Sequence, residues 1–284
     1  MEVALREASM TAPHLRARGG DVATIVAVAL VAYALSNLAH EGLAHGGACL
    51  AAGGRAEMLN AVFFDCDKSA VSPAGVRGIA AAGSLVNLAL AAAAFALLAR
   101  LRRAAPPATG AYFFWLLGTI NLLQATGYWL FSGLGGIGDW AVVVRGFEPQ
   151  ALWRAGLALA GGAGYVAAIA VGLRTLSPML GSGPGRLARA VRLTVVPYLA
   201  GGALYVAAGL FNPLGWLLVL ISAAAASLGG TSALAWMAQL LRNERRWPPH
   251  PGPALELARR PGWLVAGAAT AALFVAVLGP GIRF

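Results

Sequence analysis

Residues 22–47 read VATIVAVALVAYALSNLAHEGLAHGG, an apolar run that ends in two histidines and a glutamate. The apolar part is close to the roughly 20 residues that an α-helix needs to cross a hydrocarbon core of ~30 Å. Ionisable side chains within such a helix are costly, and clusters of them usually serve a function. The stretch therefore predicts a membrane-spanning helix that carries a functional site near one end.

The rest of the chain repeats this pattern of long apolar segments. Of its 284 residues, 59% are hydrophobic and only 11% are charged, whereas a soluble domain carries about 25% charged residues. We expect an all-α polytopic membrane protein, whose partners include the lipid bilayer itself. Its seven predicted membrane-spanning helices are residues 22–39, 78–99, 110–132, 151–173, 194–211, 214–237 and 262–279.

The basic residues predict how the chain is oriented in the membrane. The net charge is +10, but no soluble module gathers the basic residues, which argues against nucleic acid as a partner. A cytoplasmic N-terminus and an outer C-terminus agree with the positive-inside rule, and we expect a plasma membrane of the bacterial inner-membrane type. In this orientation fifteen of the 21 basic residues are cytoplasmic, and six are outside: Arg55, Lys68, Arg77, Arg145, Arg154 and Arg283.

Composition divides the chain into four predicted regions. Residues 1–20 form a polar cytoplasmic arm, and residues 21–173 form a four-helix core that holds nearly all of the intramembrane polar groups. Residues 174–193 are a basic cytoplasmic linker, and residues 194–284 are a three-helix annex. We therefore expect any metal or substrate site to lie in the core.

The spacing of His40, Glu41 and His45 favours a metal site. The zinc motif H-E-x-x-H places its histidines four residues apart on one helix face, with the glutamate as general base. Here the histidines are five apart, an offset of about 140° in a regular helix. A π-bulge, eased by the neighbouring glycines, would bring the two imidazoles together. Alternatively, Glu41 and His45 are the ligands with Cys49 one turn further on, or the histidines only hydrogen-bond to carbonyls.

Asp139, in the glycine-rich stretch GGIGDW, is the best candidate for a third ligand. Zinc is four-coordinate, and catalytic sites leave one of the four positions open. The orientation derived from the arginines places Asp139 on the same outer side as His45. An alternative interpretation is that Asp139 caps the helix that follows it.

Other residues are also expected at the outer side. The two cysteines of the chain, Cys49 and Cys66, could form a disulfide there or bind a metal. Tyr128, Trp129 and Trp140 fit the aromatic belts found at membrane interfaces.

Three stretches of the chain resemble the site-2-protease-like intramembrane metallopeptidases. Residues 40–55 (HEGLAHGGACLAAGGR) resemble the zinc helix of that family and its small-residue exit. Residues 81–91 (AAGSLVNLALA) resemble its glycine-containing helix with an asparagine, and residues 121–140 (NLLQATGYWLFSGLGGIGDW) resemble its segment that ends in a metal-binding aspartate. The chain differs from the family pattern in its histidine spacing and in Trp140, where the family has glycine.

This resemblance implies an intramembrane zinc-dependent peptidase that hydrolyses a peptide bond near the membrane face. His40, His45 and Asp139 would bind zinc, with iron as an alternative metal, and Glu41 would activate water. The substrate would be a transmembrane peptide or protein, held by backbone contacts to the amides of Asn87, Asn121 or Gln124.

Other functions remain open on the sequence. The three amides could instead serve only as hydrogen bonds between helices. Glu41, His45 and Asp139 could belong to a different metal-dependent membrane enzyme, such as an iron oxidase or a lipid-modifying hydrolase. A non-catalytic transporter or assembly protein is the third alternative.

Overall fold

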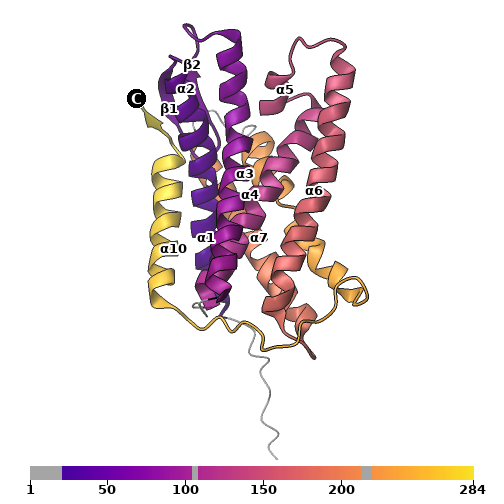
Figure 1. Cartoon of the computed structure of the whole chain (residues 1–284). Helices are drawn as coiled ribbons and strands as arrows, with labels where there is room; N and C mark the ends of the chain where they lie inside the picture. The colour runs from indigo at the N-terminus through magenta and orange to yellow at the C-terminus, as the bar shows by residue number, and fades with distance from the viewer. Residues whose placement is uncertain (1–20, 104–107, 213–218) are drawn as a thin grey trace, which may run out of the picture.

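The computed structural model describes residues 21–103, 108–212 and 219–284, and the predicted arm at residues 1–20 lies outside them. The described chain is a bundle of long helices, with a small sheet at one end (Figure 1). The all-α prediction is confirmed in its main outline, since the strands are short.

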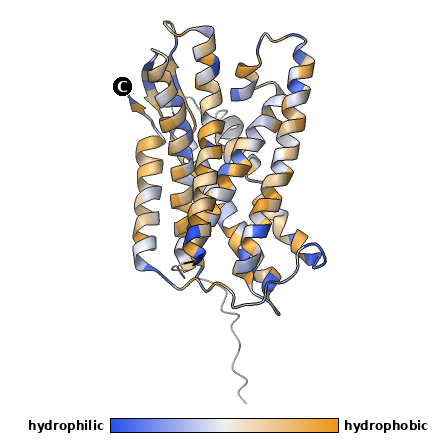
Figure 2. Cartoon of the chain, in the orientation of Figure 1, coloured by the Kyte–Doolittle hydropathy of each residue, from blue (hydrophilic) through white to orange (hydrophobic). Residues whose placement is uncertain are grey.

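Five helices of the described residues are long and apolar enough to span a membrane, which supports an integral membrane protein. Hydrophobic residues run along the length of these helices (Figure 2). The five spans are α1 (Val22–Leu38) with its continuation to Ala51, α3 (Pro73–Arg103), α6 (Gln150–Leu180), α7 (Arg186–Gly209), and α10 (Pro261–Leu273) with its continuation to Leu278.

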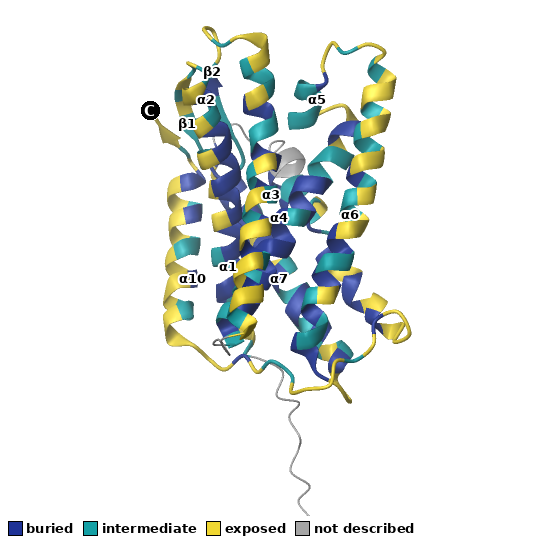
Figure 3. Ribbon diagram, viewed as in Figure 1, coloured by how far each residue is buried: buried dark blue, intermediate teal, exposed yellow. Residues whose placement is uncertain are grey.

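The outer face of α6 has the apolar surface expected for contact with lipid. Leu152, Leu159 and Val166 recur every seven residues and are 68%, 75% and 65% exposed. Seven residues are about two helical turns, so the three side chains share one face. Exposed residues cover the outside of the bundle and buried ones its interior (Figure 3). An apolar outer face of this extent is typical of contact with a membrane.

The prediction of seven spans is confirmed only for these five. Helix α4 (Ala108–Gly135) has the length to cross a membrane, but it does not reach the hydropathy of the other five because it carries polar and aromatic residues. The predicted span at residues 214–237 is not one regular helix where it is described. It contains the π-helix η2 (Val219–Gly229) and α9 (Ala233–Trp236), and the 3₁₀ helix η3 (Met237–Arg242) follows.

The connection between α6 and α7 is much shorter than the predicted linker of residues 174–193. Residues 174–180 continue α6 and Arg186 begins α7, which leaves only 181–185 between the helices. Gly181, Gly183 and Gly185 have positive φ angles of 62°, 86° and 88°. Glycine adopts such angles without steric penalty, so the chain can reverse direction within five residues.

The predicted annex packs directly against α1. A Cβ on Gly267 of α10 would lie 2.6 Å from the Cα of Ala27. A Cβ on Gly201 of α7 would overlap the ring of Tyr33. Glycine at both positions therefore lets α7 and α10 approach α1 closely, as small residues do in membrane helix packing.

A three-stranded antiparallel sheet covers the end of the bundle that also holds α5 (Asp139–Val143) (Figure 1). Its strand order is β2 (Phe64–Asp67), β1 (Arg55–Leu59) and β3 (Ile282–Arg283). A disulfide joins Cys49 of α2 (Gly47–Ala51) to Cys66 of β2. Cys49 is therefore not a metal ligand, which settles one alternative that the sequence leaves open.

Candidate metal centre

A π-helical segment, η1 (Ala39–Gly46), brings His40 and His45 together. Hydrogen bonds of the i→i+5 type place residues five apart above one another, where a regular helix would not. The two Nε2 atoms are 3.2 Å apart. The π-bulge expected from the five-residue spacing is therefore confirmed.

The glycines of η1 let the sheet pack on the helix face turned away from the histidines. A Cβ on Gly42 would lie 3.6 Å from the side chain of Leu59, and one on Gly46 would lie 3.2 Å from the ring of Phe64. The sheet thus closes one side of the segment, and the histidines face α3 and α5.

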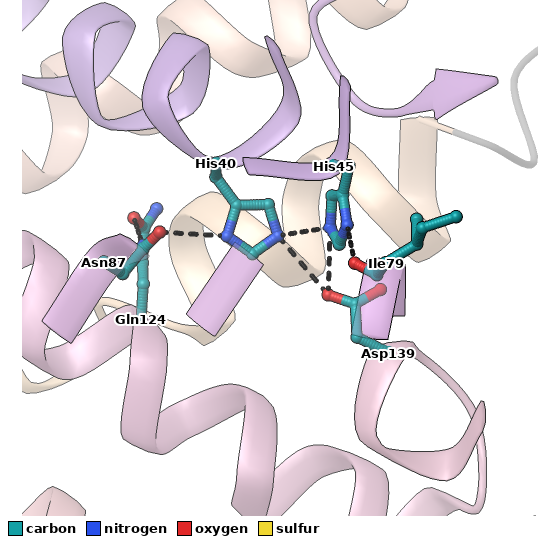
Figure 4. A network of polar contacts seen from close by, with 6 residues as sticks. All are labelled: His40, His45, Ile79, Asn87, Gln124 and Asp139. Atoms are coloured by element: carbon teal, nitrogen blue, oxygen red, sulfur yellow. Dashed lines mark hydrogen bonds and ion pairs between the residues drawn. The ribbon is translucent and has the colours of Figure 1, made fainter. Parts of the chain in front are cut away.

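Asp139, the first residue of α5, completes a group of three ligand atoms (Figure 4). Its Oδ2 lies 3.3 Å from His40 Nε2 and 3.4 Å from His45 Nε2. The structure thus brings together the three predicted ligands, from segments almost a hundred positions apart in the sequence, as a possible metal-binding triad.

The hydrogen bonds of the two imidazoles leave both Nε2 atoms free to bind a metal. His40 Nδ1 lies 3.0 Å from Asn87 Oδ1, and His45 Nδ1 lies 2.7 Å from the backbone oxygen of Ile79. Both partners are acceptors, so Nδ1 carries the proton in each neutral ring and Nε2 presents a lone pair. Metal-binding histidines are commonly oriented in this way by a carbonyl or a carboxylate.

The carboxylate of Asp139 also fits a bound cation. Its Oδ2 is buried and makes no hydrogen bond of good geometry within the described residues, although both Nε2 atoms lie close by. Burial acts to raise the pKa of the Asp139 carboxyl, but contacts with His40 and His45 outweigh burial and hold this pKa below its usual range. A carboxylate oxygen facing two imidazole lone pairs is stabilised by a cation placed between them.

Gly83 of α3 provides the space in which the two imidazoles meet. A Cβ at this position would lie 2.5 Å from His40 Cε1 and 2.7 Å from His45 Nε2. Gly83 was not among the site residues predicted from the sequence. The signal for it was its position four residues before Asn87, which places both residues on the face of α3 turned toward η1.

The three amides predicted to bind substrate lie behind His40 in one buried network. Asn87 Nδ2 donates to Gln124 Oε1 at 3.2 Å, and Ser36 Oγ donates to the same oxygen at 2.6 Å. Ser36 Oγ also lies 3.1 Å from Asn121 Oδ1. These contacts are interhelical hydrogen bonds, among which Asn87 bonds directly to His40, and a substrate-binding role stays a prediction.

Glu41 is buried next to the triad but is not one of its three converging ligands. In the part of the chain that the structure describes, its carboxylate has no hydrogen-bond or ion-pair partner. The position suits a group that exchanges protons beside a metal, because no partner holds its oxygens.

Aromatic residues of α4 contact His40 and the residue that follows Asp139. Tyr128 stacks on His40 with ring centroids 4.9 Å apart, and Trp129 packs edge-on against Trp140 at 5.4 Å. The interfacial role expected for these residues did not include these contacts. Tyr128 follows Asn121 and Gln124 at helical spacing on one face of α4, which is the signal that would have found it.

Comparisons of this chain with protein-family models, with curated proteins and with solved structures find no match. The chemistry of the site therefore has to be read from its own residues. Two imidazole nitrogens and one carboxylate oxygen are donors that suit both zinc and non-haem iron.

Proposed function

We propose that this chain is a membrane-embedded, zinc-dependent hydrolase that cleaves a peptide bond near the outer membrane face. The spacing of the three ligand atoms carries the proposal. Tetrahedral zinc with bonds of about 2.0–2.1 Å separates neighbouring ligand atoms by about 3.3–3.4 Å. The three separations in the triad are 3.2, 3.3 and 3.4 Å. Three ligands leave a fourth position open, as in catalytic zinc sites.

The residues have distinct roles in this proposal. His40, His45 and Asp139 hold the metal, which when bound lowers the pKa of water and polarises a carbonyl. Glu41 accepts the proton of the attacking water and later delivers it to the leaving amine. Asn87 and Ile79 keep the two imidazoles in the tautomer that binds a metal.

The substrate class follows from where the triad lies. His40 and His45 belong to a membrane-spanning helix, and Asp139 lies at the end of the bundle covered by the sheet. A peptide bond reaches this depth when it belongs to a transmembrane peptide or protein. The resemblance of residues 40–55, 81–91 and 121–140 to the site-2-protease-like family supports the same class.

A non-haem iron enzyme is the second candidate, because two histidines and one carboxylate also form the facial triad of iron oxygenases. That site is octahedral. Its donor set is the same, so metal analysis of the purified chain distinguishes the two candidates.

A Glu41→Gln variant tests the proposed reaction. It removes the proton acceptor but keeps the side-chain shape, so we expect full zinc content and at least a ~100-fold loss of cleavage of a membrane-inserted reporter peptide. Glu57→Gln, on strand β1, is the matched control and should leave both quantities unchanged. Undiminished cleavage by Glu41→Gln would remove Glu41 as the base.

A further inference from the structure

A small cavity lies beside His40, within the bundle. Its walls come from α1, η1, α4, α7 and η2, and all but one of its lining residues carry a polar group. They are Asn37, His40, Gln124, Tyr128, Tyr205 and Ala226. Neither the ligands of the proposed metal nor Glu41 accounts for the polar side chains of Asn37 and Tyr205 at this cavity.

Asn37 gives the first indication of what the cavity holds. The side chain is only 5% exposed, and its Nδ2 donates to the backbone oxygen of Ala61 at 3.0 Å. Its Oδ1 has no hydrogen-bond partner among the described residues. Buried polar atoms are nearly always bonded to protein or to ordered water.

Tyr205 of α7 gives the second indication. Its hydroxyl donates to the backbone oxygen of Tyr33 at 3.3 Å, and a hydroxyl oxygen can also accept hydrogen bonds. The hydroxyl also lies beside the amides of Asn37 and Gln124. The residues that carry these two acceptor oxygens, together with the amide of Gln124, thus line the same cavity, and an ordered buried water typically makes two to four hydrogen bonds.

We propose that this cavity holds one ordered water, which completes the polar network behind His40. The water donates to Asn37 Oδ1 and to the Tyr205 hydroxyl oxygen. Gln124 lines the same cavity, and its Oε1 accepts from Asn87 Nδ2. Asn87 Oδ1 in turn lies at hydrogen-bond distance from His40 Nδ1, and this chain of contacts connects the cavity to His40. Asn37 and Tyr205 are therefore positioning residues for a metal ligand, and α7 supports a site to which it contributes no ligand.

A high-resolution map of the purified chain tests the water directly. We expect an ordered density within about 2.7–3.2 Å of both Asn37 Oδ1 and the Tyr205 hydroxyl. A cavity without density in a map that resolves waters elsewhere in the bundle would overturn the proposal. So would a rotated Asn37 whose Oδ1 is bonded to protein.

The variant Tyr205→Phe tests the coupling to His40, with zinc alone and cobalt alone as probes. We expect a three- to ten-fold weaker zinc affinity, below the 10–100-fold typical of direct partners of a ligand. We also expect a shifted visible spectrum of the cobalt-loaded chain, which reports the ligand geometry. Tyr33→Phe removes a buried tyrosine hydroxyl that does not line the cavity, and it should change neither readout.

Two outcomes of the variant test would contradict the inference. One is an unchanged affinity and spectrum in Tyr205→Phe, and the other is an equal change in both variants, which would indicate a general packing effect. The inference rests on the proposed metal site, but a failure of the inference can be distinguished from a failure of the proposed function. A wild-type chain that binds zinc and shows a dry cavity refutes the water and leaves the function, whereas a chain that binds no zinc refutes the function.

Discussion

The imidazoles of His40 and His45 meet above the backbone of Gly83, so the site depends on a missing methyl group. The ligands themselves were predictable from the sequence, because histidines and a glutamate inside an apolar helix are conspicuous. Gly83 was not, because its importance comes from a contact between α3 and η1 rather than from its own chemistry. Contacts of Tyr128 and Tyr205 were missed for the same reason.

A Gly83→Ala substitution should separate the two imidazoles. The added Cβ would lie 2.5–2.7 Å from both rings, so one ring must move, and we expect at least a ~10-fold weaker zinc affinity. Gly78→Ala on the same helix is the matched control, since nothing lies within 4 Å of its Cβ. Competition with a chromogenic chelator measures both variants. Equal affinities would show that Gly83 does not shape the site.

Replacing Asn87 by alanine should weaken metal binding through His40. The variant removes the acceptor at 3.0 Å that fixes His40 Nδ1, and loss of such a partner typically lowers metal affinity 10–100-fold. Asn121→Ala removes a neighbouring buried amide that does not contact His40. The same chelator assay should find Asn121→Ala close to wild type, and the opposite order would contradict the network.

At the scale of elements, the π-helix η1 brings the two histidine ligands of the site together. The five-residue spacing predicted it, because only an i→i+5 turn places both histidines on one face. The arginine distribution, together with the loop position of Asp139, placed the third ligand at the same end of the bundle. The sequence could not show that Ile79 would fix His45, since that contact uses a backbone oxygen.

The disulfide between Cys49 and Cys66 should stabilise this end of the bundle. It packs with Ile79, whose backbone oxygen fixes His45. For a sequence separation of 17 residues, a disulfide contributes about 3 kcal/mol. We expect a phosphine reductant to lower the thermal midpoint in detergent by several degrees and to weaken zinc binding. The double variant Cys49→Ser with Cys66→Ser should be insensitive to the reductant, and an unchanged wild-type midpoint would refute this role.

At the scale of the whole molecule, the apolar outer surface and the five spans support a membrane protein. Beyond these five, the two remaining spans stay predictions, because α4 carries polar and aromatic residues and residues 214–237 lie partly outside the described residues. The cytoplasmic N-terminus and the plasma membrane stay predictions. They agree with a disulfide at the predicted outer end, because disulfides persist in oxidising compartments.

Short epitope tags test the orientation. A tag after Ala70, in the exposed turn before α3, should be labelled on intact cells, because that end is predicted to face outward. A tag after Gly183, in the exposed turn between α6 and α7, should be labelled only after the membrane is permeabilised. The reverse pattern would invert the topology and place the metal site toward the cytoplasm.

X-ray absorption and metal analysis of the purified chain test the central claim most directly, which is that His40, His45 and Asp139 bind one zinc ion. We predict one zinc per chain, with imidazole and carboxylate ligands at about 2.0–2.1 Å, and loss of that zinc in Asp139→Ala but not in Asp67→Ala. A chain without stoichiometric metal, or with metal that persists in Asp139→Ala, would contradict the account.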